Sequence, residues 1–176
     1  VLALFTSYNM GLFAITTMTP LYLRANHDFS WFETALAMAA MMTAGALAQP
    51  WMGKISDGIG RRPLIILGNA LACGAAIIAW AFSSVAITLV ALGVAMTALV
   101  AIRAVLQAAA VDHAGNREGT SLGLTFAFMD GFAATAAVLA GLAGESDLAN
   151  AFLLASGFSL IAVVLALTLP KKQHVG

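Results

Sequence analysis

The sequence predicts an all-α membrane protein with six transmembrane helices. Hydrophobic residues make up 61% of its 176 positions and charged residues only 9%. A water-soluble domain carries roughly 25% charged residues, so this chain has too little polar surface to be one. The charges are also clustered, and apolar runs of about 20 residues recur between the clusters, the length that spans a hydrocarbon core roughly 30 Å thick. The chain is therefore expected to cross a bilayer several times.

Charges, glycines and prolines divide the sequence into six apolar spans with short connections. The spans lie at about residues 2–22, 31–52, 63–82, 85–108, 120–143 and 148–169, and together they form one domain over residues 1–176. Two helix starts have local signals. Ser30, with Glu33 three residues later, fits a capping box, and Pro63 suits a first helical position because its missing N–H costs nothing there.

The basic residues predict the orientation of these spans. One side of the membrane receives nearly all of them, and the other side receives only Arg24. The basic side carries Lys54, Arg61, Arg62, Arg117, Lys171 and Lys172. Both ends of the segment are therefore expected in the cytosol, and the membrane is expected to be the plasma (inner) membrane.

Composition and motifs argue against several other functions. The formal net charge is zero and no long basic run is present, so nucleic-acid binding has no electrostatic basis. The single cysteine, Cys73, lies in an apolar run, forms no intrachain disulfide and supplies at most one metal ligand. A nucleophile elbow, a two-His zinc motif and paired intramembrane carboxylates are all missing from the sequence. We therefore predict no enzyme activity, no metal site and no cofactor.

The first span differs from the others because it carries a polar stripe. At 100° per residue its polar side chains fall within one broad face, which needs a cavity or polar neighbours rather than lipid. The stripe consists of Thr6, Asn9, Thr16 and Thr19. The alternative is that these side chains form hydrogen bonds across helices.

Arg103 and Asp130 are the only charged residues well inside the predicted spans. A charge near the bilayer centre costs about 2.5 to 3.5 kcal/mol, so such residues usually face a cavity or form a pair. Counting about 1.5 Å per residue from the same loop places both at similar heights on consecutive antiparallel helices. A direct or solvent-bridged pair is therefore feasible. Either the two residues face a polar cavity, or they form a fixed structural ion pair.

The connection between the second and third spans, residues 53–65, carries the most specific motif. It resembles the signature loop of the major facilitator superfamily, Gly-x-Leu-x-Asp-Arg-x-Gly-Arg-Arg/Lys, which follows the second helix of either six-helix half. The five matching positions are Gly53, Asp57, Gly60, Arg61 and Arg62. Two positions depart from the pattern: Gly58 replaces the usual Arg or Lys and Ile59 a common aromatic residue, so one charge of the loop is missing.

The resemblance implies that this loop latches the cytosolic gate of a transporter. Gly53 and Gly60 permit a turn in which a side chain would clash or φ must be positive. Asp57 is expected to accept hydrogen bonds from the free N–H groups at the start of a helix and to pair with a nearby arginine. The alternative is that Arg61 and Arg62 only set topology and bind lipid phosphate.

The resemblance also implies that the chain is one half, expected to be the C-terminal half, of a secondary transporter that moves a small solute by alternating access. Its partners would be the lipid bilayer, a small-molecule substrate and the other six-helix half, which is expected upstream. The fourth helix echoes the family's Arg-x-x-Gln-Gly pattern in Arg103 and Gln107, with the spacing off by one. The candidates for substrate binding or proton coupling are Arg103, Asp130, Asn9, Thr16 and Gln107. A non-transporting sensor or scaffold with the same fold remains the alternative function.

Overall fold

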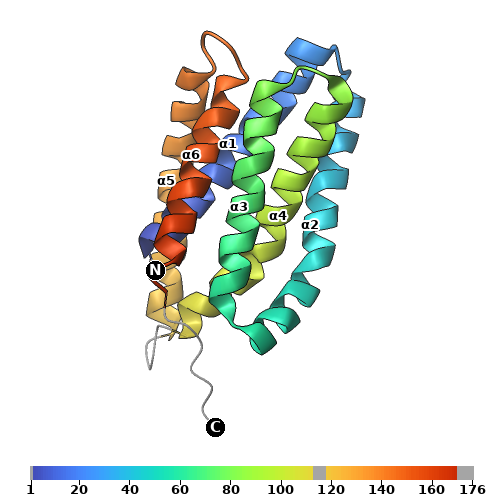
Figure 1. The fold of residues 1–176 in the computed structure, drawn as a ribbon. Coiled ribbons are helices and arrows are strands. Elements are labelled where there is room, and N and C mark those ends of the chain that lie inside the picture. Colours follow the sequence, from blue (N-terminus) through green and yellow to red (C-terminus); the bar gives the residue numbers. More distant parts are fainter. Residues whose placement is uncertain (1, 113–117, 170–176) are drawn as a thin grey trace.

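Six helices form the part of the chain that the structure describes, a computed structural model covering residues 2–112 and 118–169 (Figure 1). Most connections between them are short, as the sequence predicted. The helices are α1 (Leu2–His27), α2 (Trp31–Ile59), α3 (Arg61–Ala81), α4 (Val85–Asp112), α5 (Glu118–Ala143) and α6 (Asn150–Ala166).

The predicted helix starts were more accurate than the predicted ends. α1, α2 and α4 begin at the expected residues, but α2 continues to Ile59 and α4 to Asp112, beyond the predicted ends at residues 52 and 108. Hydropathy marks the part of a helix that lies in the membrane, whereas backbone hydrogen bonding continues into the polar region. α3 begins at Arg61, so Pro63 lies in its first turn rather than at its first position.

The start of α2 confirms the predicted capping box. The Ser30 backbone N–H donates to a Glu33 carboxylate oxygen at 2.8 Å, and the Glu33 N–H donates to Ser30 Oγ at 3.2 Å. Two otherwise unpaired backbone donors are satisfied in this way, which fixes the point at which the chain turns from α1 into α2.

Within the described residues, four helices are long and apolar enough to cross a membrane: α2, α3, α4 and the segment Gly123–Ala143 of α5. α1 has 26 residues, but its polar side chains lower its hydropathy, and α6 is apolar but has only 17 residues. The all-helical fold is thus confirmed, while length and composition identify four spans rather than the predicted six.

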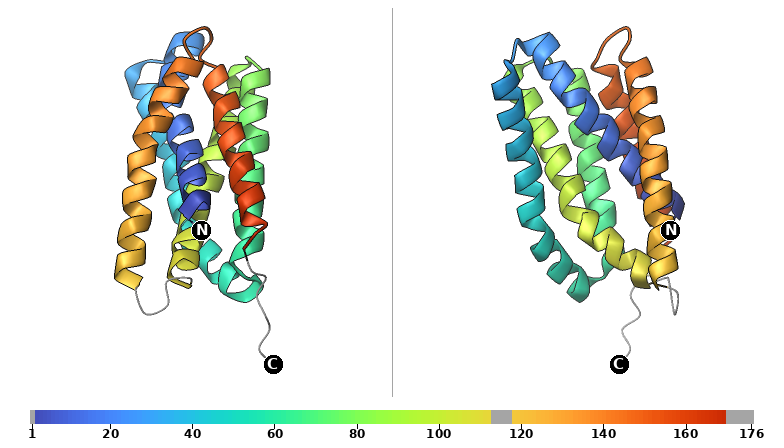
Figure 2. Two further views of the ribbon diagram at one scale, coloured as in Figure 1. Left: turned by 90° about the vertical axis from the view of Figure 1, so that its left-hand side faces the viewer. Right: turned by 180° about the vertical axis from the view of Figure 1, so that it is seen from behind.

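The bundle has two different sides. α3 and α6 contact each other and lie together in the foreground of Figure 1. From behind, α2, α4, α1 and α5 are visible, and α1 crosses obliquely between α4 and α5 (right view of Figure 2). α1 packs against α5 and α6, and α4 packs against α2 and α3. α1 and α4 therefore form the centre of the bundle.

Two glycines allow other helices to approach α4 closely. A Cβ on Gly45 of α2 would lie 2.6 Å from the Cβ of Val100, and a Cβ on Gly68 of α3 would lie 2.5 Å from Cγ2 of Ile102. Both distances are too short for real side chains, so the α2–α4 and α3–α4 contacts depend on glycine.

Candidate functional site

The five motif residues lie at the junction of α2 and α3, where most of the expected loop is helical. Gly60 alone separates the two helices, and its φ of 95° is a conformation that favours glycine. Gly53 lies inside α2, has no positive φ, and a Cβ there would meet nothing within 4 Å. A positive φ therefore explains the glycine at position 60, whereas neither a positive φ nor a side-chain clash within this chain explains the one at position 53.

Arg61 joins the ends of three helices. Its Nη1 donates to Ser56 Oγ and, at 2.5 Å, to Asp57 Oδ1, both near the end of α2. Its Nε donates to Asp112 Oδ2, at the end of α4, at 3.2 Å. We call Ser56, Asp57, Arg61 and Asp112 the Arg61 clamp, and the end of the bundle that contains it the basic end. The clamp holds the start of α3 against α2 and α4.

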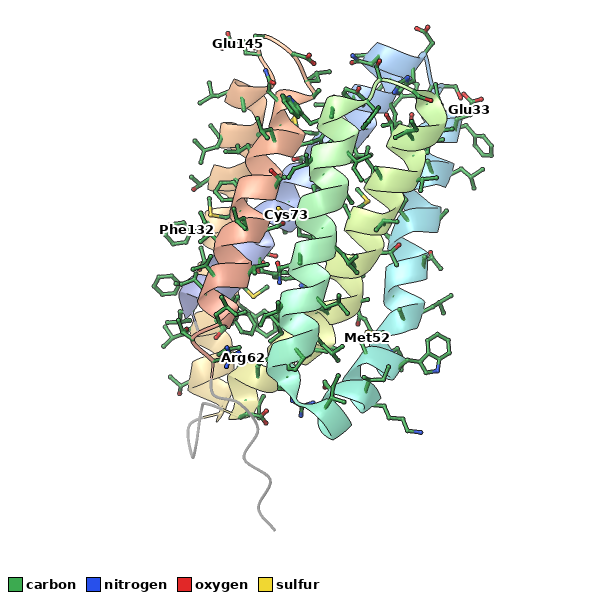
Figure 3. All side chains as sticks on the ribbon, in the orientation of Figure 1. Glu33, Met52, Arg62, Cys73, Phe132 and Glu145 are labelled. Atoms are coloured by element: carbon green, nitrogen blue, oxygen red, sulfur yellow. The ribbon has the colours of Figure 1, made fainter. Side chains whose placement is uncertain are left out.

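Two members of the clamp were not predicted. The sequence indicated a pair between Asp57 and a nearby arginine, and Arg61 forms it. Asp112 and Ser56 were missed, although Asp112 is an acid just beyond the predicted end of the fourth span, on the same side as the motif. Arg62, the second residue of α3, is half-buried and lies on the side of that helix toward α6 (Figure 3).

A second polar centre lies in α1, where three consecutive side chains donate hydrogen bonds to carbonyls of three other helices. Ser7 Oγ donates to Phe158 O of α6 at 2.7 Å and Tyr8 Oη to Leu99 O of α4 at 2.7 Å. Asn9 Nδ2 donates to Met129 O of α5 at 2.8 Å. Consecutive helical residues point 100° apart, which is why three neighbours reach three helices. We call Ser7, Tyr8 and Asn9 the α1 hub; all three are buried.

The α1 hub fixes the relative heights of Arg103 and Asp130. Leu99 lies one turn before Arg103, and Met129 directly precedes Asp130. Because α4 and α5 run in opposite directions, Arg103 lies nearer the basic end and Asp130 farther from it. Their separation along the bundle is five residues, or about 7 Å.

Of the two arrangements that the sequence made feasible for Arg103 and Asp130, the direct pair does not form. Among the described residues, both ion pairs within 4.0 Å involve Arg61. The oblique path of α1 between α4 and α5, together with the offset in height, explains the separation. Arg103 is half-buried and acts electrostatically on the Tyr8 hydroxyl, whereas Asp130 is exposed.

The remaining candidates have different surroundings. Gln107 is half-buried one turn beyond Arg103, so both lie on a half-buried stripe of α4. Thr16 is also half-buried, but its hydroxyl donates to Leu12 O of its own helix at 2.9 Å. Thr19 likewise donates to Ile15 O. The polar stripe of α1 is therefore divided: Asn9 bonds across helices, as the alternative interpretation held, while Thr16 and Thr19 bond within α1.

The described surface also contains an apolar groove of about 480 Å³ between α2, α3 and α4, whose lining includes Met52 (Figure 3), Leu71, Val94 and Ile102. Thr97 is its one polar side chain among the residues that line it, so the groove offers little to a polar solute. No group of three or more His, Cys, Asp or Glu residues within residues 2–112 and 118–169 is arranged to hold a metal ion.

Comparison with known proteins agrees with these features. Proline/betaine transporters of Escherichia coli (strain K12) and Salmonella typhimurium (strain LT2) are each 36% identical to the chain over 61 residues. Each match covers 35% of this chain and only 12% of the relative. The model of the Major Facilitator Superfamily matches residues 1–176, the full length of the chain. The chain therefore belongs to the Major Facilitator Superfamily and is an integral membrane protein of a transporter family.

Proposed function

We propose that the chain is one six-helix half, the C-terminal one, of a secondary transporter that moves a small solute across the plasma membrane by alternating access. Both of its ends would be cytosolic, as the distribution of lysine and arginine indicates. No cofactor or catalytic step is required. The other half would be a second six-helix unit of the same protein or a second copy of the chain.

The two sides of the bundle differ as expected if one side contacts lipid and the other contacts the second half of the transporter. α3 contains no charged residue between Pro63 and Ala81, and α6 contains none from Asn150 to Ala166, as suits helices in contact with lipid. The opposite side, formed by α2, α4, α1 and α5, would face the other half (Figure 2). The solute path would then lie between the two units, as in other transporters built from structural repeats.

The observation that carries the proposal is the placement of Arg103 and Asp130. Arg103 is half-buried on α4 and Asp130 is exposed on α5, with the α1 hub between them. Charges at this depth are costly unless water, solute or a partner solvates them. A solute path between two halves would supply that environment for both residues.

The spacing of these charges favours a zwitterionic solute. An arginine and a carboxylate about 7 Å apart along the bundle suit a molecule with an anionic and a cationic group. The names of the matched relatives, which are proline/betaine transporters, point to the same class. Arg103 would bind the solute carboxylate, Asp130 would bind its cationic group or carry a coupling proton, and Gln107 and Thr16 would line the path. Asn9 would position α5.

The Arg61 clamp would serve as the gate at the cytosolic side. It joins α2, α3 and α4 within this half, and its ion pairs are partly exposed to solvent. Partly exposed pairs contribute little stability each, so they can break and re-form as the helices move. Such a contact suits a gate better than a permanent link.

Uptake by the assembled transporter in proteoliposomes tests the proposal, with radiolabelled proline and glycine betaine as probes and an imposed proton gradient. Arg103→Gln should raise the KM for the probes at least about tenfold, because a lost buried charge contact typically costs more than 1.4 kcal/mol. Asp130→Asn should abolish gradient-driven accumulation but keep exchange. Glu145→Gln, which removes an exposed carboxylate beyond the end of α5, is the matched control and should behave as the unmodified protein.

Three outcomes would count against parts of this proposal. Normal gradient-driven accumulation by Asp130→Asn would exclude the coupling role. Uptake of neither probe by the unmodified protein would exclude this solute class. Specific binding of a probe without uptake would favour a non-transporting sensor.

A further inference from the structure

The α1 hub connects the two intramembrane charges through a short chain of contacts. From Asp130 the chain passes to the neighbouring Met129 carbonyl, which accepts from Asn9 at 2.8 Å. The adjacent residue, Tyr8, donates to Leu99 O at 2.7 Å, one helical turn before Arg103. Two hydrogen bonds and one peptide unit of α1 thus join the charged parts of α5 and α4.

Burial makes these links resistant to exchange with solvent. Tyr8 is fully buried and Asn9 is 1% exposed. Breaking either bond would leave a buried donor without a partner, which is unfavourable in an environment of low dielectric constant. A movement of α5 at Met129 is therefore expected to carry α1 with it, and α1 is expected to carry α4.

We propose that Tyr8 and Asn9 are positioning residues that couple Asp130 to Arg103, so that the charge state of Asp130 changes the position of the Arg103 segment of α4. This inference rests on the proposed function only for the roles of the two charges in transport. Coupling of this kind needs an element whose position both sites influence, and α1 is that element.

A thiol-labelling cycle on the assembled protein in native membranes tests the coupling. The reporter is Ala108→Cys, on the same half-buried stripe of α4 as Arg103, in a Cys73→Ser background. The rate of modification by N-ethylmaleimide is compared with and without Asp130→Asn. The comparison is made with the hub intact and again in the Tyr8→Phe, Asn9→Leu and Ser7→Ala backgrounds.

Ser7→Ala is the matched control because it removes the hub's bond to α6, which carries no intramembrane charge, and leaves the bonds to α4 and α5 in place. With the hub intact, Asp130→Asn should change the labelling rate by about fivefold or more, the lower range of measured coupling energies. The change should persist in Ser7→Ala. It should fall below about twofold, the usual limit of additivity, in Tyr8→Phe and in Asn9→Leu.

Three results would overturn the inference: no change of rate with the hub intact, the same change in Tyr8→Phe as in the intact hub, or loss of the change in Ser7→Ala as well. Tyr8→Phe keeps the ring and its packing, so the test stands even if Asn9→Leu does not fold. Labelling requires no solute. Failure of proline or betaine uptake would therefore not contradict this inference. Absence of coupling in the labelling experiment would likewise not contradict the transport proposal.

Discussion

The Arg61 clamp and the α1 hub both join three or more helices, but they do so with different chemistry. The clamp uses charged side chains, with Arg61 25%, Asp57 67% and Asp112 51% exposed. The hub uses neutral donors that are buried and bind backbone carbonyls. Solvent and salt compete with the first kind of contact and not with the second. The comparison indicates that the contacts at the basic end can exchange with solvent and salt, whereas those at the centre of the bundle cannot.

The largest effect on stability should come from truncating the hub. Tyr8→Ala should lower the free energy of unfolding by about 3 to 5 kcal/mol, because a large buried side chain is removed and a cavity remains. Tyr8→Phe, which loses only the hydroxyl, should cost about 1 kcal/mol. Denaturant titration in mixed micelles, followed by tryptophan fluorescence, measures both. Equal losses in the two variants would show that the hydrogen bond matters more than the packing.

An intermediate effect should come from the α3–α4 contact, which sets the distance that the Arg61 clamp bridges. Gly68→Ala should destabilise the protein by about 1 to 3 kcal/mol, because the new methyl group would overlap Ile102. Gly74→Ala in the same helix is the matched control, since a Cβ there meets nothing within 4 Å. The same titration compares them. A loss in Gly74→Ala as large as that in Gly68→Ala would contradict this account of the contact.

The smallest effect on stability should come from the clamp itself. Asp112→Asn should cost less than about 1 kcal/mol, because the pair with Arg61 is partly exposed. The loss should shrink further at high salt, whereas the loss in Tyr8→Phe should not change with salt. Unfolding measured at low and high ionic strength separates the two. A loss of several kcal/mol in Asp112→Asn, independent of salt, would mean that the clamp is a permanent link like the hub.

Much of the fold could be predicted from the sequence because membrane helices depend on local signals. Apolar runs located all six helices, and the Ser30–Glu33 pair fixed the start of α2. The ends of α2 and α4 were misplaced because hydropathy falls at residues that continue the helix, and only Gly60 interrupts the backbone between α2 and α3.

The candidate site was harder to predict because it depends on how helices pack. The motif located Arg61 and Asp57, but the part played by Asp112 requires that the end of α4 meet the start of α3. A pair between Arg103 and Asp130 was considered only because their heights in the membrane are similar. The sequence did not reveal that α1 passes between their helices. A run of four neighbouring hydrogen-bonding side chains, Thr6 to Asn9, between apolar residues was the one available signal for the α1 hub.

The unexpected length of α2 has a mechanical consequence for the Arg61 clamp. With 29 residues from Trp31 to Ile59, the helix extends about 43 Å, well beyond a hydrocarbon core of roughly 30 Å. A tilt of the whole helix about its capped start at Ser30 would therefore move its far end the most. A tilt of about 5° would move the far end by about 4 Å at this length. If Arg61 moved with the end of α2, a shift of this size would lengthen the 3.2 Å contact between Arg61 and Asp112 well beyond the roughly 4 Å reach of an ion pair, so a small tilt of α2 would be enough to release it.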